Sequence, residues 1–416
     1  MKIVIISGTA PPEPVTAGRA HYDLAEHLST EGNVVWFISP KPTRPLGMVY
    51  PETNGNVIST IKDNFFHVRL NSYAYPSYDL LKRARESVDF GYRSAKFINT
   101  FIRDYDIIYA SPWAFLGQLI IILLRCNKKR PLIMDVQDLY PESYLTKIRS
   151  GFLKALWRPL FAIDWYIARK SAHLTVISES LKRVYTDKRK IPVDKVTVIQ
   201  NWQDPEPFIN TKILKEDILN RYNLNRASDR FIYMYLGNIG PVAGVETILD
   251  SFALLGDSNT FLIIAGSGSA REKCYTMAQK LNLENVAFID VPSGLQPVVE
   301  LQGIADVLLL PIHPEAANSS IPSKLIAYMF SGKPVITSAN MLSETASAIK
   351  ESGCGWIIKS NGSSDWVEAM DSAMKTENSR LNNMGRSGYE YAMEHYSKKS
   401  GLIRMTRVLD NFNNSN

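Results

Sequence analysis

The sequence predicts an α/β protein with two doubly wound parallel sheets, one in each half of the chain. Short runs rich in β-branched residues alternate with longer segments of helical periodicity, and the alternation starts again after a polar connector. Such repeats pair their strands in parallel and place helices on both faces of the sheet. A chain of 416 residues also exceeds the size at which one hydrophobic core stops growing.

The first half opens on a strand at residues 2–7 and a helix at residues 20–31. The helix carries apolar residues at Leu24, Ala25 and Leu28, and Gly32 ends it. Further strands of this half are expected at residues 33–39, 107–109, 132–135 and 174–177.

A strand at residues 196–199 is expected to be followed by turn residues at 201–207 and a charged linker at 212–229, and the second half comes after them. Its strands are expected at residues 231–236, 261–265, 286–289, 307–310 and 334–337. The predicted domains are 1–205, 206–385 and a C-terminal helix, 386–416, packed on the first domain. Two such sheets in tandem predict a central cleft at the carboxyl ends of their strands, where α/β sheets bind ligands.

The composition is that of a globular protein, with 45% hydrophobic and 21% charged residues. Three cysteines lie far apart without a CxxC pair, which is typical of a reducing compartment and argues against disulfides and zinc. The first apolar run is shorter than the core of a signal peptide, and residues 113–124 fall below the roughly 18 residues that span a bilayer. We therefore expect a cytoplasmic protein, with peripheral contact at the inner face of the cell membrane as an open alternative.

The charge is uneven along the chain. Residues 1–210 hold 28 Lys and Arg against 20 Asp and Glu, whereas the remaining residues hold 19 against 21. A basic surface beside apolar residues can attract an anionic membrane or an anionic substrate, although a solvated surface explains the same charges equally well. No nucleic-acid recognition motif is present, so nucleic acid is not an expected partner.

Glycine-rich loops follow several strands. The loop from Gly8 to Gly18 is long and lacks GxGxxG, which excludes the tight turn of a nicotinamide-binding domain. The length of the loop favours a role in which backbone N–H groups near Gly18 bind a substrate. The alternative is that the loop is an ordinary connector. In the second half, GNIG at residues 237–240 and GSG at residues 266–268 each follow a strand. Such loops let a backbone approach a phosphate closely. One is a weak signal, whereas two in one domain are informative.

The segment NSSIPSKL at residues 318–325 is the sharpest candidate site. Ser320 or Ser323 can cap a helix that Pro322 starts, and a diphosphate there would meet hydroxyls, amides and the Lys324 ammonium. The alternative is a capped surface helix with a solvated lysine.

Acidic residues follow the strand at residues 132–135. Asp138 can accept a hydrogen bond from an attacking hydroxyl and Glu142 can orient an acceptor, so both are candidate catalytic residues. Helix capping by acids explains them without a substrate.

Several other chemistries are excluded. The DxD spacing of Asp104 and Asp106 precedes a strand, which is the wrong end for a ligand site. The histidines show neither HxxxH nor HExxH, and the chain lacks GxSxG and a P-loop. We expect no metal and no other cofactor.

Taken in order, these motifs resemble the family 4 glycosyltransferases of the GT-B fold over nearly the whole chain. The resemblance is carried by PEP at residues 12–14, DLAEHL at 23–28 with Gly32, DVQDLYPES at 135–143, TVIS at 175–178, VIQNW at 198–202, GNIG at 237–240 and IPSK at 321–324. It is closest to the bacterial branch that builds O-antigen, capsule and related polysaccharides, including L-fucosamine transferases.

The resemblance implies a hexosyl- or N-acetylhexosaminyl-type transferase that retains the anomeric configuration. A nucleotide-sugar donor, usually a UDP-sugar, would bind the second domain, and an acceptor would bind the first. That acceptor is often a sugar linked to polyprenyl diphosphate, so residues 152–161 and 73–92 are candidate membrane segments. The implied donor-binding residues are Gly18, Gly237, Asn238, Gly240, Gly266, Ser267, Gly268, Val291, Ser320, Ile321, Pro322, Ser323 and Lys324.

The chain departs from the family pattern at two places. Asn238 and Ala243 stand where the family usually has a basic pair, and Ser319 and Ala327 stand at the positions of an E-x7-E motif. The diphosphate would then depend on Lys324, with Arg271 as a further candidate. Two alternatives therefore stay open: a UDP-sugar 2-epimerase-like enzyme and a non-catalytic sugar-nucleotide-binding subunit.

Overall fold

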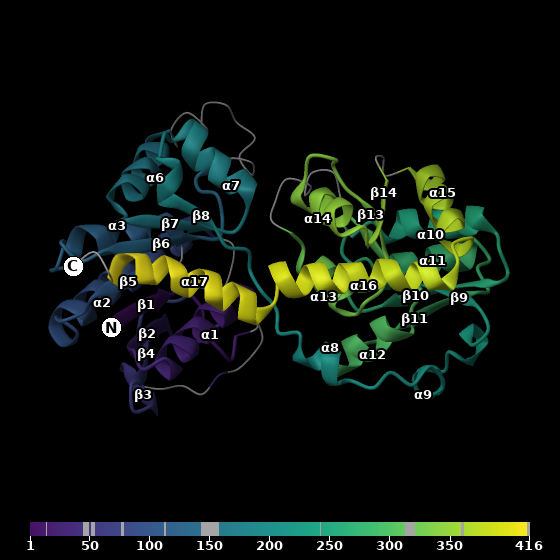
Figure 1. Ribbon diagram of the computed structural model, residues 1–416, viewed down its shortest axis with the longest axis horizontal. Helices are drawn as coiled ribbons and strands as arrows, with labels where there is room; N and C mark the ends of the chain where they lie inside the picture. Colours follow the sequence, from purple (N-terminus) through teal and green to yellow (C-terminus); the bar gives the residue numbers. More distant parts are fainter. Residues whose placement is uncertain are drawn as a thin grey trace. The chain divides into compact units, whose positions relative to one another are not determined.

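The computed structural model describes residues 1–13, 15–44, 50, 55–75, 79–111, 114–142, 158–241, 243–312, 321–358 and 362–413. The chain forms two compact units (Figure 1). Unit 1 comprises Met1–Asn201 and Gly401–Asn416, and unit 2 comprises Trp202–Ser400. The sequence placed this boundary four residues later, at 205. It also assigned the whole of 386–416 to a helix on the first domain, whereas the structure leaves residues up to 400 in unit 2.

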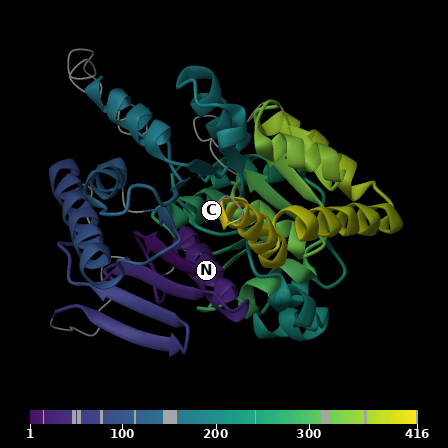
Figure 2. The ribbon, with the colours of Figure 1, turned by 60° about the vertical axis from the view of Figure 1, so that its left-hand side comes forward.

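Unit 1 is built on an eight-stranded sheet in the order β3-β4-β2-β1-β5-β6-β7-β8. All neighbours are parallel except β3 and β4, the outer pair that Figure 2 shows in purple-blue. The strands are β1 (Lys2–Ser7), β2 (Val34–Pro40), β3 (Val57–Lys62), β4 (Phe65–Leu70), β5 (Ile107–Ser111), β6 (Leu132–Val136), β7 (His173–Val176) and β8 (Val196–Val198). The strand expected at residues 196–199, within the predicted first domain, is β8, which pairs with β7 in the first sheet.

Helices connect these strands as parallel pairing requires. They are α1 (Thr16–Thr30), α2 (Leu80–Phe101), α3 (Ala114–Leu124), α6 (Pro159–Lys170) and α7 (Glu179–Arg183), which continues into a π-helical turn at Val184–Lys188. The first helix begins at Thr16, four residues before its expected start, and its capping residue, Val15, has an extended backbone and supplies no side-chain cap.

Unit 2 is a six-stranded parallel sheet in the order β11-β10-β9-β12-β13-β14. Its strands are β9 (Phe231–Leu236), β10 (Thr260–Ala265), β11 (Val286–Ile289), β12 (Val307–Pro311), β13 (Val335–Ser338) and β14 (Gly355–Ile358). Side chains of β9 alternate between two cores: Ile232 and Met234 pack on one side, Tyr233 and Tyr235 on the other. This alternation places an apolar layer on each face of the sheet, as a doubly wound fold requires.

Helices connect the strands of unit 2 and cover its sheet. The helices are α8 (Glu206–Asn210), α9 (Lys215–Arg221), α10 (Val245–Leu255), α11 (Arg271–Lys280), α12 (Gln296–Ile304), α13 (Ser323–Phe330), α14 (Glu344–Ser352), α15 (Ser363–Met374) and α16 (Asn378–His395).

The chain passes between the units twice, and the two passages meet at Gln203. The amide of Gln203 donates to the carbonyl of Tyr396 at 3.0 Å, and the amide of Lys398 donates to the carbonyl of Gln203 at 2.9 Å. The last helix, α17 (Lys398–Asn413), then contacts unit 1, where the ring of Phe412 meets that of His173 at 5.9 Å. The single terminal helix of the sequence analysis is therefore two helices with a break after His395.

Candidate functional site

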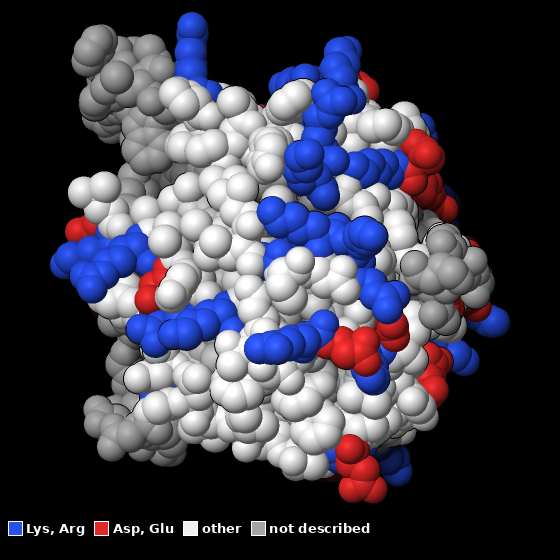
Figure 3. Space-filling model, turned by 90° about the vertical axis from the view of Figure 1, so that its left-hand side faces the viewer, with Lys and Arg blue, Asp and Glu red and all other residues white. Residues whose placement is uncertain are grey.

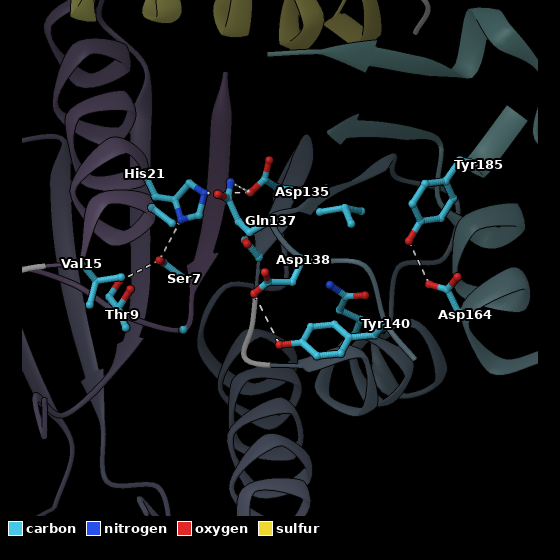
Figure 4. Close-up of a pocket in the computed structure, with 15 residues that line it drawn as sticks. Ser7, Thr9, Val15, His21, Asp135, Gln137, Asp138, Tyr140, Asp164 and Tyr185 are labelled. Atoms are coloured by element: carbon cyan, nitrogen blue, oxygen red, sulfur yellow. Dashed lines mark hydrogen bonds and ion pairs between the residues drawn. The ribbon is translucent and has the colours of Figure 1, made fainter. Parts of the chain in front are cut away.

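Unit 1 carries a pocket of about 140 Å³ at the carboxyl ends of β1, β5 and β6 (Figure 4). This edge of a parallel sheet is where α/β folds bind ligands. We name it the unit 1 pocket. It is lined by Ser7, Gly8, Thr9, Val15, Ala17, His21, Ser111, Gln118, Asp135, Val136, Gln137, Asp138, Tyr140, Asp164 and Tyr185.

A line of buried hydrogen bonds forms one side of this pocket. Ser7 Oγ donates to the carbonyl of Thr9 at 2.7 Å and lies 2.9 Å from Nδ1 of His21. Nε2 of His21 lies 3.0 Å from Oδ2 of Asp135 (Figure 4). The sequence analysis assigned no role to His21, because nothing in its helical spacing distinguishes it from a core residue and its partner Asp135 lies 114 positions away.

The carboxylate of Asp135 has further partners. Its oxygens accept hydrogen bonds from Thr175 Oγ1 at 2.8 Å and Gln137 Nε2 at 2.6 Å. Burial by itself raises the pKa of Asp135, but these donors and His21 outweigh that effect and hold the pKa below its usual value. Asp135 is therefore ionised at neutral pH.

The two candidate catalytic acids lie in different surroundings. Asp138 is exposed and lines the unit 1 pocket, where the hydroxyl of Tyr140 lies 3.5 Å from its Oδ2. Glu142 does not line the pocket; its two oxygens accept hydrogen bonds from Nη2 of Arg189 at 3.0 and 2.9 Å. Of the two, Asp138 is therefore the acid that a pocket ligand can meet.

Arg189 ties together three segments around the pocket. Besides Glu142, its guanidinium donates to the carbonyl of Tyr140 at 3.2 Å and to Asp164 through Nε. Asp164, on α6, also accepts from the Tyr185 hydroxyl at 2.9 Å. Burial raises the pKa of Asp164, and the charge of Arg189 opposes that rise.

Gly18 lies behind the unit 1 pocket rather than on its lining. It is buried in the first turn of α1, and a Cβ there would collide with Thr9. Its glycine lets α1 approach the loop that carries Thr9, so the residue shapes the pocket without lining it.

Unit 2 carries a second pocket, of about 300 Å³, where β9, β10 and β11 end. We name it the unit 2 pocket. Five of the predicted donor-binding residues share it. Its lining consists of Gly237, Asn238, Gly266, Ser267 and Val291, together with Leu236, Asp290 and Val298.

The glycines of this pocket are required by backbone geometry. Gly237 has a φ of 151° and Gly266 a φ of 131°, both in the region that L side chains rarely adopt. A Cβ on Gly266 would collide with the carbonyl oxygen of Gly237, and one on Gly268 with that of Ile239. The loops after β9 and β10 therefore pack backbone against backbone. Gly240 is buried beside Asn238 and does not line the pocket.

Lys324, on α13, lies beside Gly237, although it is not one of the residues that line this pocket. Its ammonium donates to the Tyr235 hydroxyl at 2.6 Å and lies 4.5 Å from the centre of the same ring. A Cβ on Gly237 would collide with the Lys324 side chain, so the lysine passes directly over that glycine. Burial lowers the pKa of Lys324 to about 8, because the charged form loses water there.

The other residues of the IPSK segment, Ile321, Pro322 and Ser323, lie at the start of α13. Ser323 is the first residue of α13, and Pro322 occupies the capping position without a side-chain cap, so the expected capping by Ser323 is wrong. Ser323 is exposed, and its carbonyl accepts from Gln203 Nε2 at 2.8 Å; Ile321 and Pro322 are half-buried. Ser320 lies outside the described residues.

Arg271, the further candidate for a diphosphate contact, starts α11 after the second glycine loop. Its Nη2 lies 3.2 Å from Oδ1 of Asp290, a residue that lines the unit 2 pocket. The guanidinium therefore stands beside this pocket.

The described parts of the chain contain neither a metal-binding cluster nor a membrane-spanning helix. No cluster of three His, Cys, Asp or Glu side chains able to hold a metal ion occurs there. No described helix is long and apolar enough to cross a membrane.

Comparisons with known proteins match both halves of the chain. The family described as Glycosyltransferase Family 4 matches residues 17–207, and the family described as Glycosyl transferases group 1 matches residues 217–391. "Probable glycosyltransferase WbjE" of Pseudomonas aeruginosa is 22% identical over 67% of this chain and 68% of its own length. "Putative colanic acid biosynthesis glycosyl transferase WcaI" of Escherichia coli K12 is 26% identical over 41% of this chain and 42% of its own.

Solved structures share the two-unit fold. Anabaena Alr3699/HepE, solved in complex with UDP, matches 99% of this chain and 100% of its own length with a TM-score of 0.68 and 12% identity. The fold class expected from the sequence, GT-B with two parallel-sheet domains, is confirmed.

Proposed function

Because the chain belongs to the GT-B glycosyltransferases that combine a family 4 domain with a group 1 domain, we propose that it transfers a sugar from a nucleotide-sugar donor with retention of anomeric configuration. The donor is a UDP-sugar held by unit 2. The acceptor, held by unit 1, is a sugar of a surface-polysaccharide precursor, free or linked to polyprenyl diphosphate. Neither a metal nor another cofactor takes part.

The unit 2 pocket carries this proposal. Two positive-φ glycines leave the loop backbones open to a phosphate, and the Lys324 ammonium lies beside one of them. A diphosphate seated there would lie between amide dipoles and a cation in a partly desolvated site, which stabilises the negative charge that develops on a leaving group. The complex of HepE with UDP supports a uridine nucleotide as the group to test first.

The reaction then needs little further protein chemistry. The bond between the anomeric carbon and the diphosphate oxygen breaks, and a bond from that carbon to an acceptor oxygen forms on the same face. The acceptor proton passes to the departing diphosphate oxygen, so charge and atoms balance. Before the transfer, Asp138, exposed in the unit 1 pocket, accepts a hydrogen bond from the acceptor hydroxyl and orients it; in the transfer itself the proton goes to the diphosphate oxygen and not to Asp138.

The setting we propose is polysaccharide assembly beside an anionic membrane. The name of the E. coli relative supports the first part. Figure 3 supports the second: many Lys and Arg side chains, and fewer Asp and Glu side chains, lie on the side that it shows. We name the segments just before β5, β6 and β7 the basic face; they include Arg103, Lys128, Lys129, Arg130, Arg169 and Lys170. Phe101 is 67% exposed at the end of α2, next to Arg103.

Two other segments were predicted to contact the membrane from sequence. In the first, 152–161, residues 152–157 lie outside the described part. In the second, Lys82 stands over the ring of Tyr75 and Arg85 over that of Tyr73, at 4.5 and 4.4 Å. Both segments stay predictions.

One experiment separates the proposal from its alternatives. The purified chain is incubated with a panel of UDP-sugars, with and without lipid-linked acceptors, and the products are identified by mass spectrometry and NMR. Release of UDP with hydrolysis or transfer of the sugar, the anomeric configuration being kept, is the expected result. Inversion at C2 of the donor sugar would indicate an epimerase instead, and binding of UDP-sugars without turnover would indicate a non-catalytic subunit.

A further inference from the structure

Helix α2 carries exposed apolar side chains along its outer face. Leu81 is 82% exposed, Val88 39% and Tyr92 49%. Their spacing of seven and then four positions places them in one line along the helix. We name these three residues, together with Arg85 and Lys96 on the same line, the α2 stripe. Helix α16 shows the usual pattern instead, because every exposed residue on it is polar or charged.

The packing of α2 explains why the stripe faces outward. The opposite face of the helix places Phe90 and Phe97 in the core of unit 1. Helix α3 packs closely on α2, because a Cβ on Gly91 would collide with the backbone of Gly117, whose amide donates to Ser87 Oγ at 2.8 Å. Figures 1 and 2 both show α2 at the outer margin of unit 1. A line of exposed apolar residues on such a helix is typical of an interaction surface.

The charges beside the stripe are positive. Lys82, Arg85, Arg93 and Lys96 are exposed, and no Asp or Glu is exposed on the described part of α2. Asp89 is half-buried and pairs with Arg93 at 2.8 Å. Within the described residues, neither Arg85 nor Lys96 has a carboxylate partner. The outer face of α2 therefore presents apolar side chains and uncompensated cations side by side.

The stripe also leads to the basic face at the end of α2. Asn99 Nδ2 donates to the carbonyl of Leu124 at 2.8 Å, and its Oδ1 accepts from the amide of Cys126 at 2.9 Å. These bonds tie the last turn of α2 to the segment that carries Lys128 and Lys129. The apolar and the basic features therefore belong to one side of unit 1.

An anionic lipid bilayer matches this combination. In an interfacial helix, apolar side chains enter the boundary of headgroups and acyl chains, while Lys and Arg stay beside the anionic headgroups. An attraction by charge alone would need the cations but not Leu81, Val88 and Tyr92. The apolar line therefore favours insertion over contact by charge alone.

We propose that α2 lies flat in the interface of an anionic membrane, with Leu81, Val88 and Tyr92 inserted among the lipids. The inference rests on the proposed function, which places the chain beside such a membrane, and it adds the element that inserts. Helix α2 starts near the carboxyl ends of the strands, where the unit 1 pocket lies, and ends near their amino ends. A helix in this position keeps the pocket close to the bilayer, where a lipid-linked sugar can reach it.

The test measures binding of the full chain to vesicles by sedimentation. Vesicles of phosphatidylcholine with and without phosphatidylglycerol are compared. Leu81→Gln with Tyr92→Gln should weaken binding to the anionic vesicles by at least about tenfold, because two apolar side chains no longer leave water. At about 1 M salt, where screening reduces the Debye length to about 3 Å, the wild type should keep part of its binding and this double variant should lose it.

Leu254→Gln with Leu342→Gln is the matched control. These leucines of unit 2 are 68% and 91% exposed and lie far from α2 in the sequence, so this variant should bind vesicles like the wild type. Equal binding by the two double variants would overturn the inference and leave contact by the basic face alone. A wild type that binds neither kind of vesicle would also overturn it, and a protein would then be the partner of the stripe.

A second measurement reports insertion directly. Tyr92→Trp places an indole on the stripe, and lipids brominated on their acyl chains should quench the fluorescence that this indole adds to that of the wild type. The indole of Leu342→Trp should not be quenched. Bound protein in which the indole at position 92 stays unquenched would overturn the inference. UDP titration of the same samples keeps the two proposals apart, because loss of UDP binding with vesicle binding intact would overturn the nucleotide-sugar proposal alone.

Discussion

Lys324 combines burial with a single strong hydrogen bond, and its titration is the most direct signature of a ligand at the unit 2 pocket. With a pKa of about 8, the ammonium is charged at pH 7 and mostly neutral at pH 9. Affinity for UDP should therefore be highest below pH 8 and fall as the pH rises through 8. Isothermal calorimetry at pH 7 and pH 9 measures the difference.

Lys324→Met is the control for this titration. It should weaken UDP binding at pH 7 by about tenfold or more, as expected for a lost charge-assisted hydrogen bond of 1.5–3 kcal/mol, and affinity for uridine should change little. The variant should also lose the pH dependence between 7 and 9. A wild-type affinity that is the same at both pH values would remove Lys324 from the diphosphate site.

Asp138 should act on turnover rather than on the donor. Asp138→Asn keeps the size of the side chain but removes the charge that holds the acceptor hydroxyl in place, so kcat should drop by up to about 10²-fold, the cost of misplacing a reacting group. The affinity for UDP should not change. Steady-state transfer assays and UDP calorimetry on the same protein check both parts, and an unchanged kcat would contradict the role.

At the scale of residues, the sequence predicted features that depend on neighbouring positions in the chain. Gly237 and Gly266 could be predicted as loop glycines, because each directly follows a β-branched or aromatic strand. The bond between His21 and Asp135 could not, since it joins positions brought together only by the order of β1, β5 and β6. Glu142 was named as a catalytic candidate because it lies near Asp138 in sequence, whereas its carboxylate pairs with Arg189, 47 residues further on.

At the scale of elements, Arg189 should stabilise the folded state of unit 1, because it connects α6 to the loop after β6. Arg189→Met leaves the buried Asp164 without its cation, and breaking a buried pair in this way costs about 3–5 kcal/mol. Arg183→Met, an exposed position of α7, is the control and should cost less than about 0.5 kcal/mol. Urea unfolding followed by circular dichroism measures the free energy of unfolding of both variants. Equal values for the two variants would contradict the stabilising role of Arg189.

The glycine loop after β10 should be equally intolerant of a side chain. Gly266→Ala places a methyl group at a φ of 131° and against the Gly237 carbonyl, so unit 2 should lose about 1–3 kcal/mol or more and UDP binding should weaken strongly. Gly256→Ala, at a helix end with no close neighbour, should lower stability slightly and leave UDP binding unchanged. Wild-type UDP affinity in Gly266→Ala would contradict the assigned loop.

Two of the strands that sequence reasoning missed, β3 and β14, share a physical cause. β3 is an exposed edge strand with little buried surface, and β14 has only four residues, so neither gives a strong hydrophobic pattern. The strand at 196–199 was assigned to the first domain, as the structure has it, but a periodic pattern reports only that a strand exists; its pairing with β7 is seen only in the structure.

At the scale of the whole molecule, the basic face follows the carboxyl ends of α2, α3 and α6, where helix dipoles favour cations. If it also binds membranes, the chain should sediment with vesicles containing phosphatidylglycerol and not with neutral vesicles. Reversing Lys128 and Lys129 to Glu should reduce that binding by at least about tenfold, given roughly 1 kcal/mol per basic residue. Lys280→Glu with Lys350→Glu in unit 2 is the charge-matched control, and equal binding by both double variants would contradict the membrane contact.

The division into two units was readable from the restart of the strand–helix pattern, but the return of α17 to unit 1 and the break after His395 were not. Helical periodicity continues across residues 379–412, whereas in the structure unit 2 ends at Ser400, soon after Tyr396 and Lys398, which are hydrogen-bonded to Gln203 of the same unit. A cleft between the two halves stays a prediction of the sequence.

The central claim is that unit 2 binds the diphosphate of a nucleotide sugar, and a crystal structure of the chain soaked with UDP tests it most directly. The account predicts density for the diphosphate against the loops of Gly237 and Gly266, with an oxygen within hydrogen-bond distance of the Lys324 ammonium. Density for UDP at any other place, or a loop arrangement in which Lys324 turns away from a bound diphosphate, would contradict it.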